Sequence, residues 1–364
     1  MNIKSLLLGS AAALVAVTGA RAADAVVVIP EPEPVEYVRV CDVYGAGYFY
    51  IPGTETCLRL SGYYRYEVRY WPGTAGVAAV PATLDPVTGL TIPGTAAIPA
   101  TEEGYVKYAR FAPSFTAKSE TEWGTLTGHA TLYFNWTGQP PLNAYGTAVS
   151  LDHMYIELAG IRLGKGDSPY ARFLGYGGPT INDGNYGFQN TSELSYTFSG
   201  GNGFSAIIAA IEDTDDTDWT PDVEGGVKIT QGWGFVGLIA GYDESDASWG
   251  GKFVANVALS NLPVSGSLHV FYSGVNGTAG SYTILDPAGA RTEWSVLGGL
   301  TVAFSPMLEV DATVQWFDTS EWAFAVGLDI RPFSNSRLRI RPEITHNTVA
   351  GGTTGGLIRF QSDY

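Results

Sequence analysis

Residues 58–70, with the sequence LRLSGYYRYEVRY, alternate almost without interruption between two kinds of side chain. The even positions are leucine, tyrosine, valine and one glycine, and the odd positions are charged or polar: Arg59, Ser61, Tyr63, Arg65, Glu67 and Arg69. Because successive side chains of a strand point to opposite faces, this segment predicts a strand with one apolar face and one charged face. The pattern recurs along the chain and follows a secretory signal, and that combination predicts a β-barrel in an outer membrane.

The first residues have the three parts of a signal peptide. Lys4 supplies a positive charge, residues 6–19 form a short apolar run, and residues 20–22 match the small-x-small rule for a cleavage site. The run is too short for a membrane-spanning helix, which needs about 20 apolar residues. We expect residues 1–22 to be removed, residues 23–57 to form a periplasmic N-terminal segment and residues 58–364 to form the barrel.

The composition fits one large barrel better than two soluble domains. The 364-residue chain is rich in glycine and tyrosine and poor in methionine, and apolar side chains show no recurring 3.6-residue period. Its net charge is −16, whereas a nucleic-acid partner would need a basic surface. We therefore expect no nucleic-acid partner.

Cys41 and Cys57 are the two cysteines of the chain. An even pair in an exported protein predicts a disulfide, because the periplasm is oxidising. Two cysteines without a nearby histidine cannot complete a zinc shell, so we expect no metal there and no cofactor in the protein.

Counting the alternation and the turn residues predicts about sixteen antiparallel strands. The connections between them are alternately short, as at Ala159 and Gly160, and long, as over residues 71–103 and 274–291. Short periplasmic turns and long external loops are typical of bacterial outer-membrane barrels. An even strand number also lets the sheet close, which removes strand edges that lipid cannot satisfy.

Three motifs near the N-terminus carry a resemblance to a known family: VRVCD at 38–42, GAGYFYIPGT at 45–54 and CLRLSG at 57–62. With the strand pattern and length, they resemble the alphaproteobacterial, Rhizobiales-type general porins. The resemblance implies a homotrimeric, sixteen-stranded, water-filled passive channel for small hydrophilic solutes and ions. It also implies that the loop after the fifth strand, residues 167–190 behind the motif GIRLGK (160–165), folds inward and constricts the channel.

The candidate pore residues follow from strand parity. A sixteen-stranded barrel is wide enough for water, and lining charges then set its selectivity. The polar face carries a set of arginines that could form one basic wall: Arg59, Arg65, Arg69, Arg110, Arg337, Arg339 and Arg341. Asp167 and Asp183 on the inward loop would oppose this wall and create a transverse field. The alternative is scattered lumen charges that pair with Glu67 and Glu343.

Other functions have weaker support. The four histidines, His129, His153, His269 and His346, lie in no catalytic motif, so we expect no enzyme. A substrate-selective oligosaccharide channel remains the alternative function, with Tyr63, Tyr133 and Tyr155 on the lumen face by parity. A soluble secreted β-protein is a third alternative.

The acidic run at 212–222 lacks the glycine of a calcium loop, so it predicts a solvated outer loop. The expected surroundings are outer-membrane lipid and lipopolysaccharide.

Overall fold

The computed structural model describes residues 39–71, 83–84, 91–92, 103–139, 144–212, 219–259, 262–274, 281–349 and 352–364. The predicted signal peptide and most of the segment before Cys41 lie outside these residues, as does most of the acidic run. From Val40 onward the chain forms one unit. Among the described residues, no helix has the length and apolar character that crossing a membrane demands.

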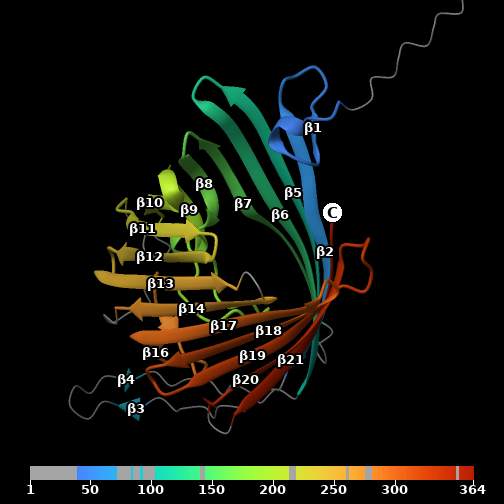
Figure 1. Ribbon diagram of the computed structural model, residues 1–364. Helices are drawn as coiled ribbons and strands as arrows, with labels where there is room; N and C mark the ends of the chain where they lie inside the picture. The colour runs from blue at the N-terminus through green and yellow to red at the C-terminus, as the bar shows by residue number, and fades with distance from the viewer. Residues whose placement is uncertain are drawn as a thin grey trace, which may run out of the picture. The chain divides into compact units, whose positions relative to one another are not determined.

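Sixteen strands of the described chain pair in sequence order and close into a ring (Figure 1). They are β2 (Cys57–Trp71), β5 (Gly104–Thr121), β6 (Gly124–Gln139), β7 (Ala144–Leu158), β8 (Ile161–Asp167), β9 (Asn190–Ser199), β10 (Phe204–Ile211), β11 (Asp222–Gln231), β12 (Gly234–Asp243), β13 (Ser248–Ala258), β14 (Val264–Ser273), β17 (Trp294–Ser305), β18 (Leu308–Phe317), β19 (Trp322–Ile330), β20 (Leu338–Asn347) and β21 (Thr353–Asp363). The ring closes at β2, which pairs with β5 on one side and β21 on the other. The predicted antiparallel β-barrel is therefore confirmed.

The predicted strands agree with the observed ones to within a few residues. Residues 58–70 are the body of β2, which extends one residue further at each end. Four further short strands form two separate hairpins: β3 (Thr83–Leu84) with β4 (Thr91–Ile92), and β15 (Ile284–Leu285) with β16 (Arg291–Thr292).

The short connection between β7 and β8 illustrates why the turns are tight. Ala159 and Gly160 both have positive φ angles, 51° and 85°. A two-residue hairpin of this hand matches the right-handed twist of the flanking strands. A side chain at Gly160 would also lie 2.6 Å from the carbonyl oxygen of Thr197, so the position accepts only glycine without rearrangement.

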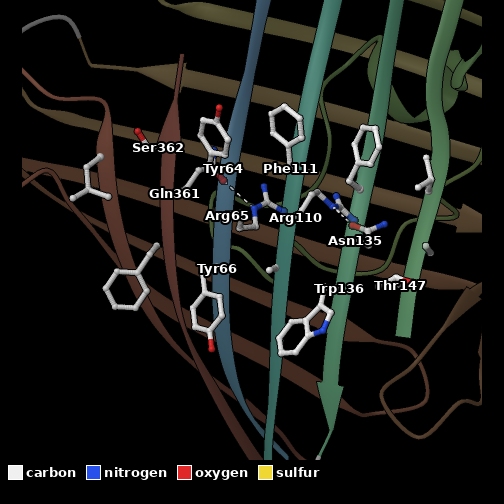
Figure 2. Close-up of a pocket in the computed structure, with 16 residues that line it drawn as sticks. Tyr64, Arg65, Tyr66, Arg110, Phe111, Asn135, Trp136, Thr147, Gln361 and Ser362 are labelled. Atoms are coloured by element: carbon white, nitrogen blue, oxygen red, sulfur yellow. Dashed lines mark hydrogen bonds between the residues drawn. The ribbon is translucent and has the colours of Figure 1, made fainter. Parts of the chain in front are cut away.

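The two faces of β2 differ as the alternation predicts. Tyr64 is 57% exposed on the outer face, whereas Glu67 is fully buried on the inner one. Outside, Tyr64 stacks on Phe111 of β5 at 5.1 Å, and Phe111 stacks on Phe134 of β6 at 5.7 Å. These rings border an outer groove of about 670 Å³ that crosses β21, β2, β5 and β6 (Figure 2). The outer surface here is a continuous aromatic belt.

A disulfide links the segment before the barrel to the first barrel strand. Cys41 and Cys57 form the predicted disulfide, which is confirmed, with their Cα atoms 6.1 Å apart. Between them lie the 3₁₀ turn η1 (Asp42–Tyr44) and β1 (Tyr48–Tyr50), and β1 adds to the end of β2. Tyr44 donates a hydrogen bond to Glu120 at 2.9 Å, and partial burial together with this carboxylate raises the pKa of Tyr44 to about 12.

Candidate functional site

Residues 168–189, between β8 and β9, form a segment that we call the inward loop. Its only helix among the described residues is α2 (Pro169–Arg172), and Ser168, Tyr170 and Ala171 in and before that helix are fully buried. The segment contacts the inner faces of β11 and β13 near its start and of β18 and β20 near its end. It therefore follows the inside of the barrel, where the sequence analysis expected residues 167–190.

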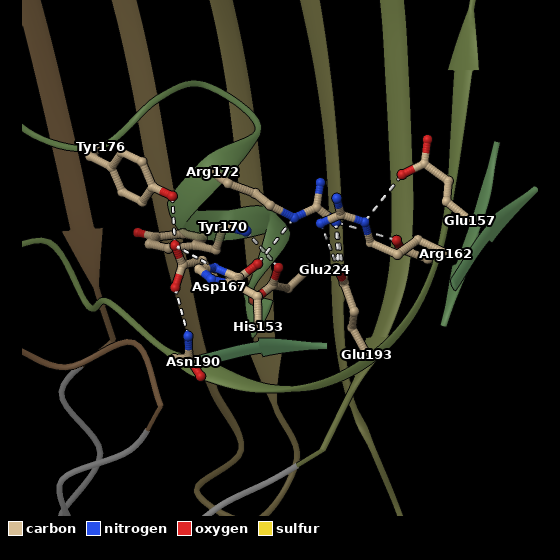
Figure 3. Close-up of polar contacts among 11 residues, drawn as sticks. His153, Glu157, Arg162, Asp167, Tyr170, Arg172, Tyr176, Asn190, Glu193 and Glu224 are labelled. Atoms are coloured by element: carbon tan, nitrogen blue, oxygen red, sulfur yellow. Dashed lines mark hydrogen bonds and ion pairs between the residues drawn. The ribbon is translucent and has the colours of Figure 1, made fainter. Parts of the chain in front are cut away.

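Salt bridges hold the start of the inward loop. Arg172 donates two hydrogen bonds to the Glu193 carboxylate of β9, at 2.7 and 2.9 Å, and Arg162 of β8 approaches the same carboxylate at 3.5 Å. Figure 3 shows both arginines pointing toward Glu193. Because Glu193 is almost completely buried, these charge-assisted bonds also satisfy a carboxylate that water does not reach.

Asp167 joins the end of β8 to the same loop. Its carboxylate accepts hydrogen bonds from Tyr176 at 2.5 Å and Asn190 at 2.9 Å, and it lies 3.3 Å from His153 Nε2 (Figure 3). The other ring nitrogen of His153 lies 2.7 Å from Asp152. One histidine thus bridges two carboxylates at the base of the inward loop. Burial and the Asp167 carboxylate raise the pKa of Tyr176.

Two buried charges of the barrel wall satisfy the ends of α2. Glu224 of β11 accepts the Tyr170 N–H at 2.6 Å, and the Lys252 ammonium of β13 donates to the carbonyls of Ala171 at 3.1 Å and of Gly175. Glu224 and Lys252 are both 0% exposed. Helix ends leave N–H and C=O groups without partners, and an acid at the start and a base at the end are the side chains that match them.

The far end of the inward loop bonds to the opposite part of the ring. Glu343 of β20 accepts the N–H groups of Ile181 and Asn182, and Gln315 of β18 exchanges two hydrogen bonds with the Asn185 backbone at 2.7 and 2.8 Å. Thr180 also donates to Thr313 at 2.7 Å. Glu343 is an ion-pair partner in the alternative prediction, but in the structure it accepts hydrogen bonds from the loop backbone.

The inner faces of β10–β14, β17 and β18 form what we call the covered wall. Their inward side chains include Ile239, Val254 and Leu297, which are buried although a lumen would be wet. Tyr170 and Leu174 of the inward loop pack on the first two. A Cβ atom at Gly237 would lie 2.3 Å from Leu174, so the wall is shaped to admit the loop.

This apolar lining was not predicted from the sequence. The sequence does carry a signal for it, because β10 and β12 lose the alternation: β10 reads FSAIIAAI and β12 reads GFVGLIAGYD, with apolar residues on both faces. A strand covered on both sides shows such a continuous apolar run, as in sheets buried by helices. The expected parity of polar inside and apolar outside therefore fails where the inward loop packs.

The inner faces of β20, β21, β2, β5 and β6 form what we call the open wall, which carries most of the predicted arginines. The inward loop contacts this wall at β20, through Glu343 and Arg341. Arg65 donates to Gln361 at 2.9 Å and stacks on Tyr63 at 4.5 Å. Arg110 donates to Asn135 at 2.8 Å and lies 3.7 Å from the ring centre of Tyr133. These are favourable cation–π distances, so the two guanidinium groups are held against phenol rings rather than extended freely.

Carboxylates on these strands and on β18 pair with the other arginines. Glu67 lies 2.6 Å from both Arg69 and Arg359. On β20, Arg339 pairs with Asp363 and Arg341 with Asp311, each at 2.9 Å. Arg359 was not among the predicted pore residues. It lies between the outward-facing Ile358 and Phe360 in β21, so alternation alone would have placed its side chain on the inner face.

The remaining candidate residues lie apart from this group. Arg59 stacks on Tyr48 of β1 at 5.0 Å, at the end of the barrel that carries the disulfide. Arg337 lies exposed in the turn before β20. Asp183 accepts hydrogen bonds from Tyr186 at 2.9 Å and from the Gly177 N–H at 3.3 Å, both inside the inward loop, and burial raises its pKa.

Comparison with known proteins agrees with this architecture. Residues 24–359 match the model of a family described as "Porin subfamily". Porin Omp2b of Brucella abortus is 37% identical over 398 residues, covering 100% of both chains. Porin Omp2a of Brucella ovis is 43% identical over 286 residues, covering 72% of this chain and 76% of its own.

Solved structures share the fold at low sequence identity. The outer-membrane channel DcaP of Acinetobacter baumannii superposes with a TM-score of 0.59 at 12% identity, covering 86% of this chain and 99% of its own. A triple mutant of the Rhodopseudomonas blastica porin gives 0.50 at 16% identity, covering 84% and 100%. The chain belongs to the porin family, and it is an outer-membrane β-barrel channel rather than an enzyme.

Proposed function

We propose that this protein is a passive channel for small hydrophilic solutes and ions, constricted by the inward loop. The observation that carries the proposal is the unequal lining of the barrel. The inward loop bonds to the covered wall from Glu224 to Gln315, whereas Arg65 and Arg110 on the open wall donate hydrogen bonds to Gln361, Asn135 and Tyr63 of that same wall. Solutes would pass between the inward loop and the open wall.

Selectivity in this proposal comes from the charges beside that passage. Arg59, Arg65, Arg69, Arg110, Arg339 and Arg341 are the basic residues that we assign to the channel, and Arg337 is assigned to its rim. Asp167 and Asp183 are the acidic residues assigned to the inward loop. Ion pairs already offset part of the arginine charge, closely for Arg69 and Arg341 and less closely for Arg65, which lies 3.8 Å from Glu67. Arg110 contacts uncharged partners, so Arg110 and then Arg65 should contribute most to the field.

Planar-bilayer recordings test the proposal. Purified protein should give stepwise ionic currents, and the double variant Arg65→Gln, Arg110→Gln should shift the reversal potential in a salt gradient toward cation preference. The double variant Arg110→Gln, Lys118→Gln also removes two charges but keeps Arg65. Its difference from the first variant compares the contribution of Arg65 with that of Lys118, which lies nearer the β5–β6 turn. An unchanged reversal potential in the first variant would exclude these arginines as selectivity residues.

A substrate-selective oligosaccharide channel is the alternative. It is favoured by inward aromatic rings on β2, β6 and β7, since the rings of Tyr63 and Tyr133 lie 6.5 Å apart and Tyr155 stacks on His129 at 5.0 Å. Sugars bind to such rings through their apolar faces. Saturable block of the current by maltose-type saccharides would favour this alternative, and a current that falls only with solution viscosity would favour general diffusion.

We also propose that residues 1–22 are removed on export and that the mature chain forms a homotrimer in contact with outer-membrane lipid and lipopolysaccharide. The aromatic groove bordered by Tyr64, Phe111 and Phe134 supports a partner on that face, because large apolar patches mark contact surfaces. N-terminal sequencing tests the cleavage. Closure of the current in three equal steps, with a trimer mass in mild detergent, tests the assembly.

A further inference from the structure

A second segment enters the barrel beside the inward loop. Residues 281–292, between β14 and β17, contain the β15–β16 hairpin, and we call them the strap. Their side chains alternate sharply in burial: Tyr282, Ile284 and Asp286 are buried, whereas Leu285 is exposed. A solvated external loop would not bury every second side chain. The first half of the strap therefore packs against the covered wall and the inward loop.

Tyr282 occupies a space that the covered wall leaves for it. Cβ atoms at Gly241 of β12 and Gly250 of β13 would lie 2.2 and 2.3 Å from the Tyr282 side chain. The Tyr282 ring lies 5.0 Å from the ring of Tyr170 in α2. Two neighbouring strands thus lack side chains at the positions where one ring of the strap rests on the inward loop.

The Tyr282 hydroxyl completes a buried polar arrangement. It donates to Oε1 of Glu224 at 3.2 Å, while Oε2 of Glu224 accepts the Tyr170 N–H at 2.6 Å. One wall carboxylate therefore binds the strap and the inward loop together. Burial and the Glu224 carboxylate raise the pKa of Tyr282, so it stays a protonated donor.

The strap also contacts the other end of the inward loop. The Gln189 side-chain amide donates to the Ser281 carbonyl at 2.7 Å. Ile284 belongs to the same buried cluster as Tyr186 of the inward loop, together with Phe271 and Phe317 of the wall. The strap therefore touches the inward loop at both its beginning and its end.

The strap is anchored independently of the inward loop. Asp286 accepts the N–H groups of Ala288 and Ala290, each at 2.8 Å, and accepts a hydrogen bond from Thr319 between β18 and β19 at 2.7 Å. The Ser281 N–H donates to Asp243 of the wall at 2.6 Å. With these contacts to the wall, the strap can act as a fixed support against which the inward loop rests.

We propose that the strap is a second element of the constriction and that Tyr282 is a positioning residue that holds the inward loop against the covered wall. The proposal rests on the proposed channel function. Tyr282 touches no passing solute. Its role is to keep α2 seated, so that the free cross-section beside the open wall stays constant in time.

Single-channel recordings test the role of Tyr282. Tyr282→Ala should give several-fold more frequent transitions to sub-conductance levels and closure at lower voltage, because α2 loses the ring that covers it. Tyr282→Phe keeps the ring and should lie close to the wild type. Leu285→Ala, an exposed position in the same strap, is the matched control and should change nothing. A Tyr282→Ala channel as steady as the wild type would overturn the proposal.

A cross-link separates a loose loop from a misassembled barrel. The pair Gln189→Cys and Ser281→Cys, in the Tyr282→Ala background, should form a disulfide and restore a steady current, which reductant then removes. Wild-type protein with reductant controls for the native disulfide, and heat-modifiable gel mobility reports barrel assembly. If Tyr282→Ala does not assemble, the same cysteine pair in the wild-type chain should cross-link readily, and failure to do so contradicts the proposal. A wild-type protein without conductance would instead refute the channel function.

Discussion

The open wall and the covered wall belong to one sheet and have opposite linings. The open wall carries Arg65, Arg110 and Arg341 against tyrosines and carboxylates. The covered wall carries Ile239, Val254 and other apolar residues with glycines between them. The difference follows from the inward loop and the strap, which exclude water from one side only. The inner face of this barrel is therefore polar where it meets water, and where it meets chain it combines apolar residues with buried polar side chains that bond to that chain.

Buried charges also have different roles on the two walls. On the covered wall, Glu224 and Lys252 bind the backbone ends of α2. On the open wall, Glu67 pairs with arginine side chains. Charges of the first kind position a segment and those of the second kind set a field, so substitutions on the two walls should change different properties of the channel.

The largest effect is expected from Lys252→Met. It leaves the carbonyls of Ala171 and Gly175 without the Lys252 donor, and each buried polar group left unsatisfied costs about 1–3 kcal/mol. The inward loop should leave the wall, giving an unstable current and proteolytic cleavage between β8 and β9. Lys118→Met removes the same charge far from the loop and should do neither. Equal behaviour of the two variants would contradict the difference between the walls.

A smaller effect is expected from Glu343→Gln at the far end of the inward loop. The amide keeps one acceptor oxygen for the Ile181 and Asn182 N–H groups but loses the negative charge, which should cost about 1–2 kcal/mol. The current should show more noise than the wild type and less than Lys252→Met. Noise exceeding that of Lys252→Met would place the main anchor at β20 instead of β13.

The double variant Cys41→Ser, Cys57→Ser should lower stability without changing the current. The disulfide closes a loop with a sequence separation of 16 residues, and such loops are worth roughly 3 kcal/mol in the chain-entropy account. The loss should appear as a lower temperature for the heat-modifiable gel shift. A changed conductance would show that the segment before β2 reaches the passage.

The smallest effect is expected from Arg337→Gln. Arg337 is exposed in the turn between β19 and β20, whereas Arg341 pairs with Asp311 inside the barrel. The Arg337→Gln reversal potential should match the wild type, and the Arg341→Gln value should shift. A shift of similar size in both variants would show that charges at the barrel rim matter as much as those inside.

Local patterns predicted the barrel well. The period-2 alternation at 58–70 placed β2 to within one residue, and the same reading placed the other fifteen strands. The cysteine pair predicted the disulfide, and the quoted motifs together with the strand pattern predicted the family. Each of these depends on residues close in sequence or on one residue type, so no knowledge of distant contacts was needed.

Contacts across the lumen could not be predicted in this way. Glu343 was considered an ion-pair partner and binds Ile181 and Asn182 instead. Asp183 was expected to face the arginines, and its carboxylate bonds within the inward loop. A carboxylate takes whichever donor the fold brings near it, and for both residues that donor was set by how the loop lies.

The sequence by itself determined the strands and, where alternation is clear as in β2, their inner and outer faces, because the side chains of a strand alternate between two environments. The cysteine pair and the N-terminal motifs determined the disulfide and the family. Only the tertiary structure decided which inner faces meet water. Ring closure places β20 and β21 beside β2, and the inward loop and strap then cover β10–β18 through contacts such as Tyr282 with Tyr170. These contacts join residues from about fifty to three hundred positions apart, and their energies depend on a geometry that alternation does not record.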